Sequence, residues 1–216
     1  MHGASPLRGS HRVHLSVADE IEPRELSGEP VLSVLAGAMG VVAHLSDGRR
    51  TITGLFLPGD YINLAALSRQ ISGTITALGP STLQIIDQSV FDSLLEHSRQ
   101  TREHFVSRSN ALLFQMLDHS NDLAKKTPIE RIAAFLFELR SRRDRNKSHE
   151  LNHVQIPFGR RDIADYLGLQ PETVSRGFTA LAHEGAIKLL ATDKIEILNM
   201  KGLRYIANGG RPRKKG

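Results

Sequence analysis

The spacing of apolar positions changes character along the chain. Between residues 28 and 88, short apolar segments are separated by glycine-containing turns about every ten residues, a pattern that predicts a β-barrel or jelly roll. Asp47-Gly48 lies between two of these segments and predicts a hairpin, because glycine accepts a positive φ at no steric cost. The predicted strands are Val31–Leu35, Gly40–Leu45, Thr51–Leu57, Gly73–Leu78 and Thr82–Ile86.

From about Ser89 the apolar period becomes helical, first in a short helix around Phe91. Residues 100–126 then run without glycine or proline, which predicts a helix of about 40 Å. Its apolar side chains recur at heptad spacing, a pattern that favours a dimer coil over packing on the barrel. The predicted interface residues are Phe105, Ser109, Leu112, Leu113, Met116 and Leu123.

Thr127-Pro128-Ile129-Glu130 predicts the start of another helix, with a threonine cap, a proline in the first turn and a glutamate that completes a capping box. The polar run Arg140–His153 is predicted to be a loop or a frayed helix end. A short strand, Val154–Pro157, follows it, and the last residues from Gly209 onwards are predicted to be disordered.

Two short helices, Arg160–Leu167 and Pro171–Glu184, are joined by Gly168-Leu169-Gln170, which is the layout of a helix-turn-helix. Segments Ile187–Leu190 and Lys194–Leu198 predict a hairpin that would form the wing of a winged helix. In this arrangement the second helix enters the major groove of DNA, and the residues near its N-terminus face the base edges.

Three polar residues are predicted to face outward there. Arg176 can donate two hydrogen bonds to guanine, Glu172 can accept one from cytosine, and Ser175 can pair with several base edges or touch a thymine methyl. Glu172 also stands four residues before Arg176, so we expect the carboxylate to pair with the guanidinium as well as to read a base.

The composition limits the classes of protein and of functional site that are compatible with this chain. The 216 residues are 40% hydrophobic and 24% charged, as in a soluble globular protein with room for two domains. The chain contains no cysteine, which excludes a disulfide framework, a cysteine-ligated iron–sulfur cluster or zinc site, and a thiol nucleophile. No apolar run approaches the ~20 residues that span a bilayer, and the N-terminus lacks a secretory apolar region, so we expect a cytoplasmic protein with no membrane partner.

The net charge of +5 is concentrated at one end. Residues 160–216 hold 11 Lys and Arg against 6 Asp and Glu, whereas residues 1–159 hold 17 of each. A basic C-terminal module beside a neutral one indicates a polyanionic partner such as double-stranded DNA, with a solvated basic tail as the alternative.

The segment GRRDIADYLGLQPETVSRGFTALAHEGAI resembles the helix-turn-helix of the Crp/Fnr transcription regulators. Glu172, Ser175 and Arg176 form an E-x-x-S-R pattern similar to the Fnr/FixK branch, since the Crp branch usually has glycine in place of Ser175. The segment SDGRRTITGLFLPGDYINL resembles the family's β-roll, and the resemblance covers roughly residues 26–205. It implies an α+β chain with a cyclic-nucleotide-binding-like β-roll (1–99), a dimerisation helix (100–126) and a winged helix-turn-helix (127–216).

The resemblance also implies a homodimer on a palindrome of TTGA-like half-sites, with Arg176 and Glu172 on the G·C pair and Ser175 near thymine. Pro171 departs from the family, because proline cannot hydrogen-bond a base, and it leaves the preference at the outer position open. Gly159 stands where the family often has a capping Ser or Thr, and activation would require contacts with RNA polymerase. The expected phosphate contacts are Arg160, Arg161, Gln170, Thr173 and Lys194.

The effector is the open question. The Gly-Glu pair that holds a cyclic nucleotide in this family falls on Asn63 and Leu64, the Arg-Ser/Thr pair falls on Ser72 and Gly73, and the base-contacting pair falls near Met116 and Leu117. These substitutions argue against cAMP, and the lack of cysteine excludes an Fnr-type cluster. We therefore expect no cofactor, as in FixK-type members; haem held by histidine, an unrecognised small ligand and a nucleotide-binding regulatory module remain alternatives. A cupin-like enzyme would need several barrel histidines, and only His44 lies there, so no enzyme is expected.

Overall fold

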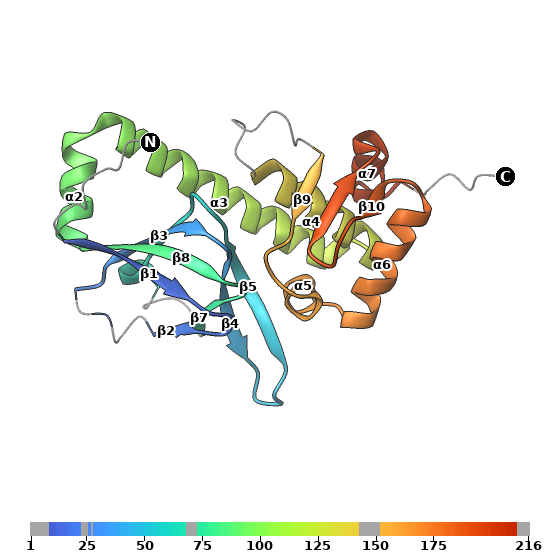
Figure 1. The fold of residues 1–216 in the computed structure, drawn as a ribbon, viewed down its shortest axis with the longest axis horizontal. Coiled ribbons are helices and arrows are strands. Elements are labelled where there is room, and N and C mark those ends of the chain that lie inside the picture. The colour runs from blue at the N-terminus through green and yellow to red at the C-terminus, as the bar shows by residue number, and fades with distance from the viewer. Residues whose placement is uncertain (1–8, 23–25, 27, 68–72, 143–151, 211–216) are drawn as a thin grey trace. The chain divides into compact units, whose positions relative to one another are not determined.

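The alternating segments of the N-terminal half form two antiparallel sheets (Figure 1). The computed structural model describes residues 9–22, 26, 28–67, 73–142 and 152–210, and the chain divides into two compact units, residues 1–114 and 115–216. In the first unit one four-stranded sheet has the order β1-β8-β3-β6 and the other the order β2-β7-β4-β5. The strands are β1 (Ser10–Leu15), β2 (Glu20–Ile21), β3 (Val31–Ala36), β4 (Met39–His44), β5 (Arg50–Phe56), β6 (Tyr61–Asn63), β7 (Thr74–Ala77) and β8 (Ser81–Ile86).

Apolar side chains from both sheets share one core, as the two-layer pattern of a β-roll requires. Leu32 and Leu83 come from one sheet, Met39 and Ile75 from the other, and all four are completely buried. The predicted N-terminal β-roll is therefore confirmed.

All five predicted strands are present, and each end lies within one residue of its predicted position. The predicted hairpin is also present: β4 and β5 pair antiparallel up to His44 and Arg50, and Gly48 has a φ of +84°. Strands β1, β2 and β6 were not predicted. They are short or largely polar on their exposed side, and pairing with β8, β7 and β3 decides their conformation.

The first unit also contains helices α1 (Leu64–Leu67), α2 (Gln88–His97) and the first part of α3 (Arg99–Lys125). Phe105 of α3 packs edge-on against Phe91 and Tyr61, with ring centroids 5.1 and 5.5 Å apart. The long helix was predicted over residues 100–126, and its observed bounds agree within one residue.

The second unit contains the last turns of α3, four more helices and a three-stranded sheet of order β10-β11-β9. Its other elements are α4 (Pro128–Arg142), β9 (His153–Gln155), α5 (Arg160–Leu167), α6 (Pro171–His183), β10 (Ile187–Leu189), β11 (Lys194–Ile197) and α7 (Met200–Ala207). In the described part of the chain, no helix is both long and apolar enough to cross a membrane.

Two predictions for this unit need correction. Helix α4 does not end before Arg140 but continues to Arg142, because Leu139 and Arg142 are buried and the Arg142 Nη1 atom lies 3.1 Å from Glu138 Oε1. Helix α7 was not predicted, since Gly202 interrupts a short pattern; Asn199 caps it by accepting a hydrogen bond from the Gly202 amide at 2.8 Å. Residues 143–151 of the predicted loop and residues 211–216 of the predicted disordered tail lie outside the described residues.

A glycine inside α6 allows this helix to pack closely on α4. Gly177 is buried, and a Cβ atom added to it would overlap the Cδ1 atom of Ile132, which is itself completely buried. Glycine in a helix interior ordinarily costs about 1 kcal/mol relative to alanine. Glycine is nevertheless suited to this position, because α6 and α4 approach so closely here that a larger side chain would overlap Ile132.

We therefore expect Gly177→Ala to lower the free energy of unfolding by about 1–3 kcal/mol in urea denaturation, despite the better helix propensity of alanine. Ile132→Val removes the overlapping Cδ1 atom and alone should cost about 0.5–1.5 kcal/mol. The double variant should lose less than the sum of the two single losses. Additivity of the two losses would show that Gly177 and Ile132 do not compete for this space.

Candidate nucleic-acid interface

Helices α5 and α6 form the predicted helix-turn-helix, with the predicted bounds except for the last residue of α6 (Figure 1). Gly168 ends α5 in the left-handed conformation, at φ +62°, where glycine carries no steric penalty. The following amide, Leu169 N, donates to the Ala164 carbonyl at 2.9 Å, which closes the turn. The buried side chains that hold the two helices together are Ile163, Ala164, Leu167, Val174, Phe178 and Leu181.

The N-terminus of α6 projects the three predicted reading residues into solvent. Gln170 occupies the N-cap position without a side-chain cap, and Pro171 fills the first turn. Glu172, Ser175 and Arg176 are all exposed. The Ser175 hydroxyl donates to the Pro171 carbonyl at 3.1 Å, so its lone pairs remain available as acceptors.

The expected pair between Glu172 and Arg176 is not formed. Within the described residues, no ion pair or hydrogen bond joins the carboxylate to the guanidinium. Exposed side chains at this spacing gain only about 0.3–0.5 kcal/mol from pairing, which offsets little of the entropy lost. Both charged groups therefore point to solvent, where each can meet a base separately.

The five expected phosphate contacts separate into two groups. Arg161 and Gln170 are exposed, and Thr173 and Lys194 are half-buried, so all four side chains reach the surface. Lys194 begins β11, beside a turn that is tied to β9 by a 2.6 Å hydrogen bond from the Gln155 amide to Asp193. The predicted wing hairpin is thus present, with strands one residue shorter than expected.

Arg160 has a different position from the other four. Its guanidinium carbon lies 3.7 Å from the centroid of the Phe178 ring, and its Nη1 atom is buried without a hydrogen-bond partner among the described residues. Burial also lowers the pKa of Arg160. The side chain packs α5 onto α6, and the sequence alone could not separate this stacking role from phosphate binding.

The N-terminus of α5 keeps a cap although Gly159 has replaced the expected Ser or Thr. The Asp162 carboxylate accepts a hydrogen bond from the Gly159 amide at 3.2 Å, which satisfies one of the unpaired donors of the first turn. The first turn of α5 is therefore capped by Asp162 and not by the residue at position 159.

The predicted dimer residues do not share one face of α3. Phe105 and Leu112 pack against the core of their own unit, and Leu123 is half-buried near Gly168. Leu113 and Met116 are exposed at 55% and 47%, and Ser109 is exposed beside them. Both faces of α3 contain apolar residues at heptad spacing. The sequence pattern alone therefore could not separate the face that packs on the chain's own core from the face that is exposed.

Further apolar side chains of α3 are exposed near Leu113 and Met116. Leu117, which the apolar pattern had placed beside Leu113, is 57% exposed. Val106 and Phe114 were not predicted, and they are 49% and 65% exposed. The signal that could have separated the two faces is the aromatic pairing of Phe105 with the β-roll, which appears only in the folded unit.

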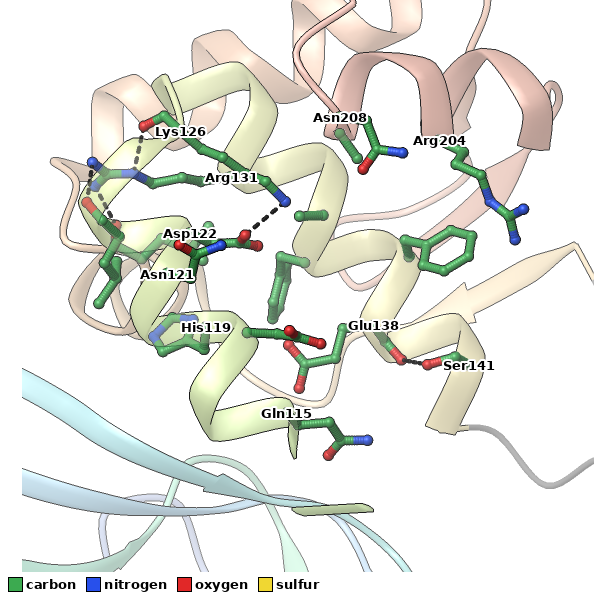
Figure 2. Close-up of a pocket in the computed structure, with 17 residues that line it drawn as sticks. Gln115, His119, Asn121, Asp122, Lys126, Arg131, Glu138, Ser141, Arg204 and Asn208 are labelled. Carbon is green, nitrogen blue, oxygen red and sulfur yellow. Dashed lines mark hydrogen bonds and ion pairs between the residues drawn. The ribbon is translucent and has the colours of Figure 1, made fainter. Parts of the chain in front are cut away.

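A cavity of about 600 Å³ lies between the last turns of α3, helix α4 and helix α7 (Figure 2). At its edge the His119 ring of α3 stacks on the Tyr166 ring of α5, with centroids 3.9 Å apart and planes 2° from parallel. Burial lowers the pKa of His119, and the Tyr166 backbone and the charge of Asp122 oppose this effect only in part. Burial, together with Glu138, raises the pKa of the Tyr166 hydroxyl. Sequence reasoning had no signal for this contact.

Two protein-family descriptions match the chain. A Crp-like helix-turn-helix domain matches residues 130–206, and a cyclic nucleotide-binding domain matches residues 25–98. These ranges fall on the second and the first unit respectively.

Whole-chain comparisons agree. The chain is 35% identical over 179 residues to the nitrogen fixation regulation protein FixK of Bradyrhizobium diazoefficiens, covering 83% of this chain and 75% of that protein. It is 32% identical over 207 residues to FixK of Rhizobium meliloti, covering 95% and 92%. The solved structure of FixK2 from Bradyrhizobium japonicum has a TM-score of 0.74 and 28% identity, covering 91% of this chain and 96% of that one.

The buried histidine predicts a pH dependence. The pKa of His119 is lower in the folded chain than in the unfolded chain, where it is about 6.5, so the unfolded chain takes up this proton first as the pH falls. The stability that neutral His119 contributes is present above about pH 6.5 and is lost below it. His119→Phe keeps a stacked ring without the titration, so the melting temperature of the wild type should fall relative to this variant between about pH 7.5 and 5.5.

The exposed His183 supplies the matched control. His183→Phe should leave the pH dependence of the melting temperature close to that of the wild type. Parallel melting curves for the wild type and His119→Phe across this range would show that the stacked ring does not control the pH response.

Proposed function

Because the chain belongs to the Crp/Fnr family of DNA-binding transcription regulators, we propose that it acts as a homodimer on a palindrome with TTGA-like half-sites. The observation that carries this proposal is the outward position of Glu172, Ser175 and Arg176 at the N-terminus of α6. These residues occupy the part of a recognition helix that faces base edges in the major groove.

Each of the three side chains matches one chemical demand of such a half-site. The Arg176 guanidinium can donate to O6 and N7 of guanine, and the Glu172 carboxylate can accept from N4 of the paired cytosine. The Ser175 side chain is short and its hydroxyl is already bound to the Pro171 carbonyl, which suits a contact with a thymine methyl. Pro171 offers no hydrogen bond at the outer position, so selectivity there should be weak.

A second copy of the chain is the occupant proposed for the exposed apolar residues of α3. Val106, Leu113, Met116 and Leu117 would remain in water in a monomer, and their burial against the same residues of a partner is favourable. Two-fold symmetry then presents two α6 helices to two inverted half-sites, about 34 Å apart along the duplex.

The position that would hold a cyclic nucleotide is unsuited to that ligand. Leu64 is completely buried in the β-roll core beside Ile62, where the family's nucleotide site needs a glutamate for the ribose, and Asn63 carries no charge. Ser72 lies outside the described residues. We propose that the protein needs neither a nucleotide nor another cofactor, and that its cellular level sets its activity.

The remaining parts of the proposal concern location, chemistry and partners. The protein acts in the cytoplasm without catalysing a reaction, and it contacts RNA polymerase when it activates transcription. Four half-buried or exposed polar residues, Arg161, Gln170, Thr173 and Lys194, contact phosphates and position α6 without reading sequence.

Binding to defined duplexes tests the proposal. At about 150 mM salt the purified protein should bind a duplex with two inverted TTGA-type half-sites at least a thousandfold more tightly than a scrambled duplex. Arg176→Ala should relax selection at the G·C pair by about 1–3 kcal/mol in a competition titration. Arg161→Ala is the control, because loss of a phosphate contact weakens all duplexes equally. Equal affinity of the wild type for both duplexes would remove the specificity claim.

The oligomeric state tests the role of α3. Leu113→Lys places a charge in the proposed apolar seam, so sedimentation should shift the protein from a dimer to a monomer of 23.9 kDa. Leu45→Lys changes a leucine of similar exposure, 47%, outside this helix and should leave the mass unchanged. A dimer that survives Leu113→Lys places the subunit contact elsewhere.

A further inference from the structure

One guanidinium of α4 connects the ends of two other helices. The last turn of an α-helix leaves backbone carbonyls without partners inside the helix, and α3 ends in this way at Lys125. Arg131 Nη2 donates to the Leu123 carbonyl at 2.8 Å, and its Nε donates to the Lys126 carbonyl at 2.9 Å. Figure 2 shows Arg131 beside Lys126 and Asp122 at this end of the cavity.

The same side chain also holds the end of α5. Arg131 Nη1 donates to the carbonyl of Leu167 at 3.0 Å, and Leu167 is the last residue of that helix. The positive charge thus lies at the C-terminal ends of two helices, where the helix dipole favours it. A planar group with five donors can reach three carbonyls in different directions, whereas a lysine ammonium acts as one compact charge.

The position of Leu167 gives this contact its importance. Gly168 follows directly and makes the turn that sets the direction of α6. A Cβ atom on Gly168 would lie 3.6 Å from both Arg131 Nη1 and the Leu123 side chain, so the turn lies directly beside these two side chains. Arg131 therefore connects the end of α3 to the turn of the helix-turn-helix by hydrogen bonds, at the place where the Leu123 side chain also approaches Gly168.

Few other contacts could replace it. Helix α3, all of which lies in the described part of the chain, contains no fully buried residue, and the 600 Å³ cavity separates part of its last turns from α4 and α7. The His119–Tyr166 stack is a second contact between α3 and α5.

We infer that Arg131 is a positioning residue for DNA recognition: it holds α6 in a fixed orientation to α3 and so sets the spacing of half-sites that the dimer accepts. This inference rests on the proposed dimeric DNA binding. Arg131 reads no base and touches no DNA; it acts through the Leu167 carbonyl and the Gly168 turn.

A series of duplexes with altered spacing separates positioning from stability. The half-sites stay constant while one or two base pairs are inserted or deleted between them, and each two-base-pair change rotates one half-site by about 70°. The wild type should prefer one spacing. Arg131→Gln should reduce this preference about threefold to thirtyfold, expressed as the ratio of affinities for the best and the altered spacing. A purely structural role would lower affinity for every duplex by the same factor and leave the ratio unchanged.

Arg102→Gln is the matched control. Arg102 Nη1 donates to the Leu95 carbonyl at 2.6 Å near the end of α2, so this variant removes a similar guanidinium–carbonyl bond within the first unit. It should keep the spacing preference of the wild type. Arg131→Lys retains the charge and the aliphatic stem, and it decides the question if the glutamine variant does not fold; it should also relax the spacing preference, because one ammonium cannot bind three carbonyls.

The outcomes distinguish this inference from the proposal on which it rests. A wild type with no preference for the palindrome over scrambled DNA overturns the proposed function. A wild type that prefers the palindrome and one spacing, together with Arg131 variants that keep the same spacing ratio, overturns the positioning role alone.

Discussion

The long helix α3 must be attached without a buried face, since none of the 27 residues between Arg99 and Lys125 is fully buried. Half-buried Phe105 and Leu112 pack against the first unit, and two arginines add polar attachments. In the first unit Arg108 donates to the Gly59 carbonyl at 3.1 Å and lies 2.5 Å from the Asp60 carboxylate, which is 2% exposed and also accepts from the Leu57 amide. In the second unit Arg131 donates hydrogen bonds to the carbonyls of Leu123, Lys126 and Leu167. Guanidinium groups suit this task because their donors satisfy several backbone or carboxylate acceptors at once.

This mode of attachment leaves the opposite side of the helix available. The arginines and the half-buried Phe105 and Leu112 contact their own units, while the apolar residues around Leu113 stay exposed. Helix α6 is divided in a similar way. Val174 and Phe178 on one side are buried, whereas Glu172, Ser175 and Arg176 on the other side are exposed. Surfaces that are exposed in this way are the ones available to a second subunit and to DNA.

The sequence predicted the local elements well, because their signals are local. Gly168 between two amphipathic segments, Pro171 at a helix start and Asp47-Gly48 in a hairpin each have one favoured backbone solution, and the structure contains all three. Predictions about individual side chains were weaker. Arg160 was assigned to phosphate but stacks on Phe178, and Phe105 was assigned to a dimer seam but packs on Tyr61. In both cases the residue type suits either role, and only its neighbours in space choose between them.

The sequence by itself determined the order of elements, the β-roll, the helix-turn-helix and the outward positions of Glu172, Ser175 and Arg176, because periodicity, turn chemistry and motif spacing act over a few residues. Tertiary structure alone decided which face of α3 is free, why Gly177 lies inside a helix, and how one arginine serves two helix ends. These features depend on contacts between residues that are distant in the chain, such as Arg131 and Leu167, and sequence spacing carries no record of such distances.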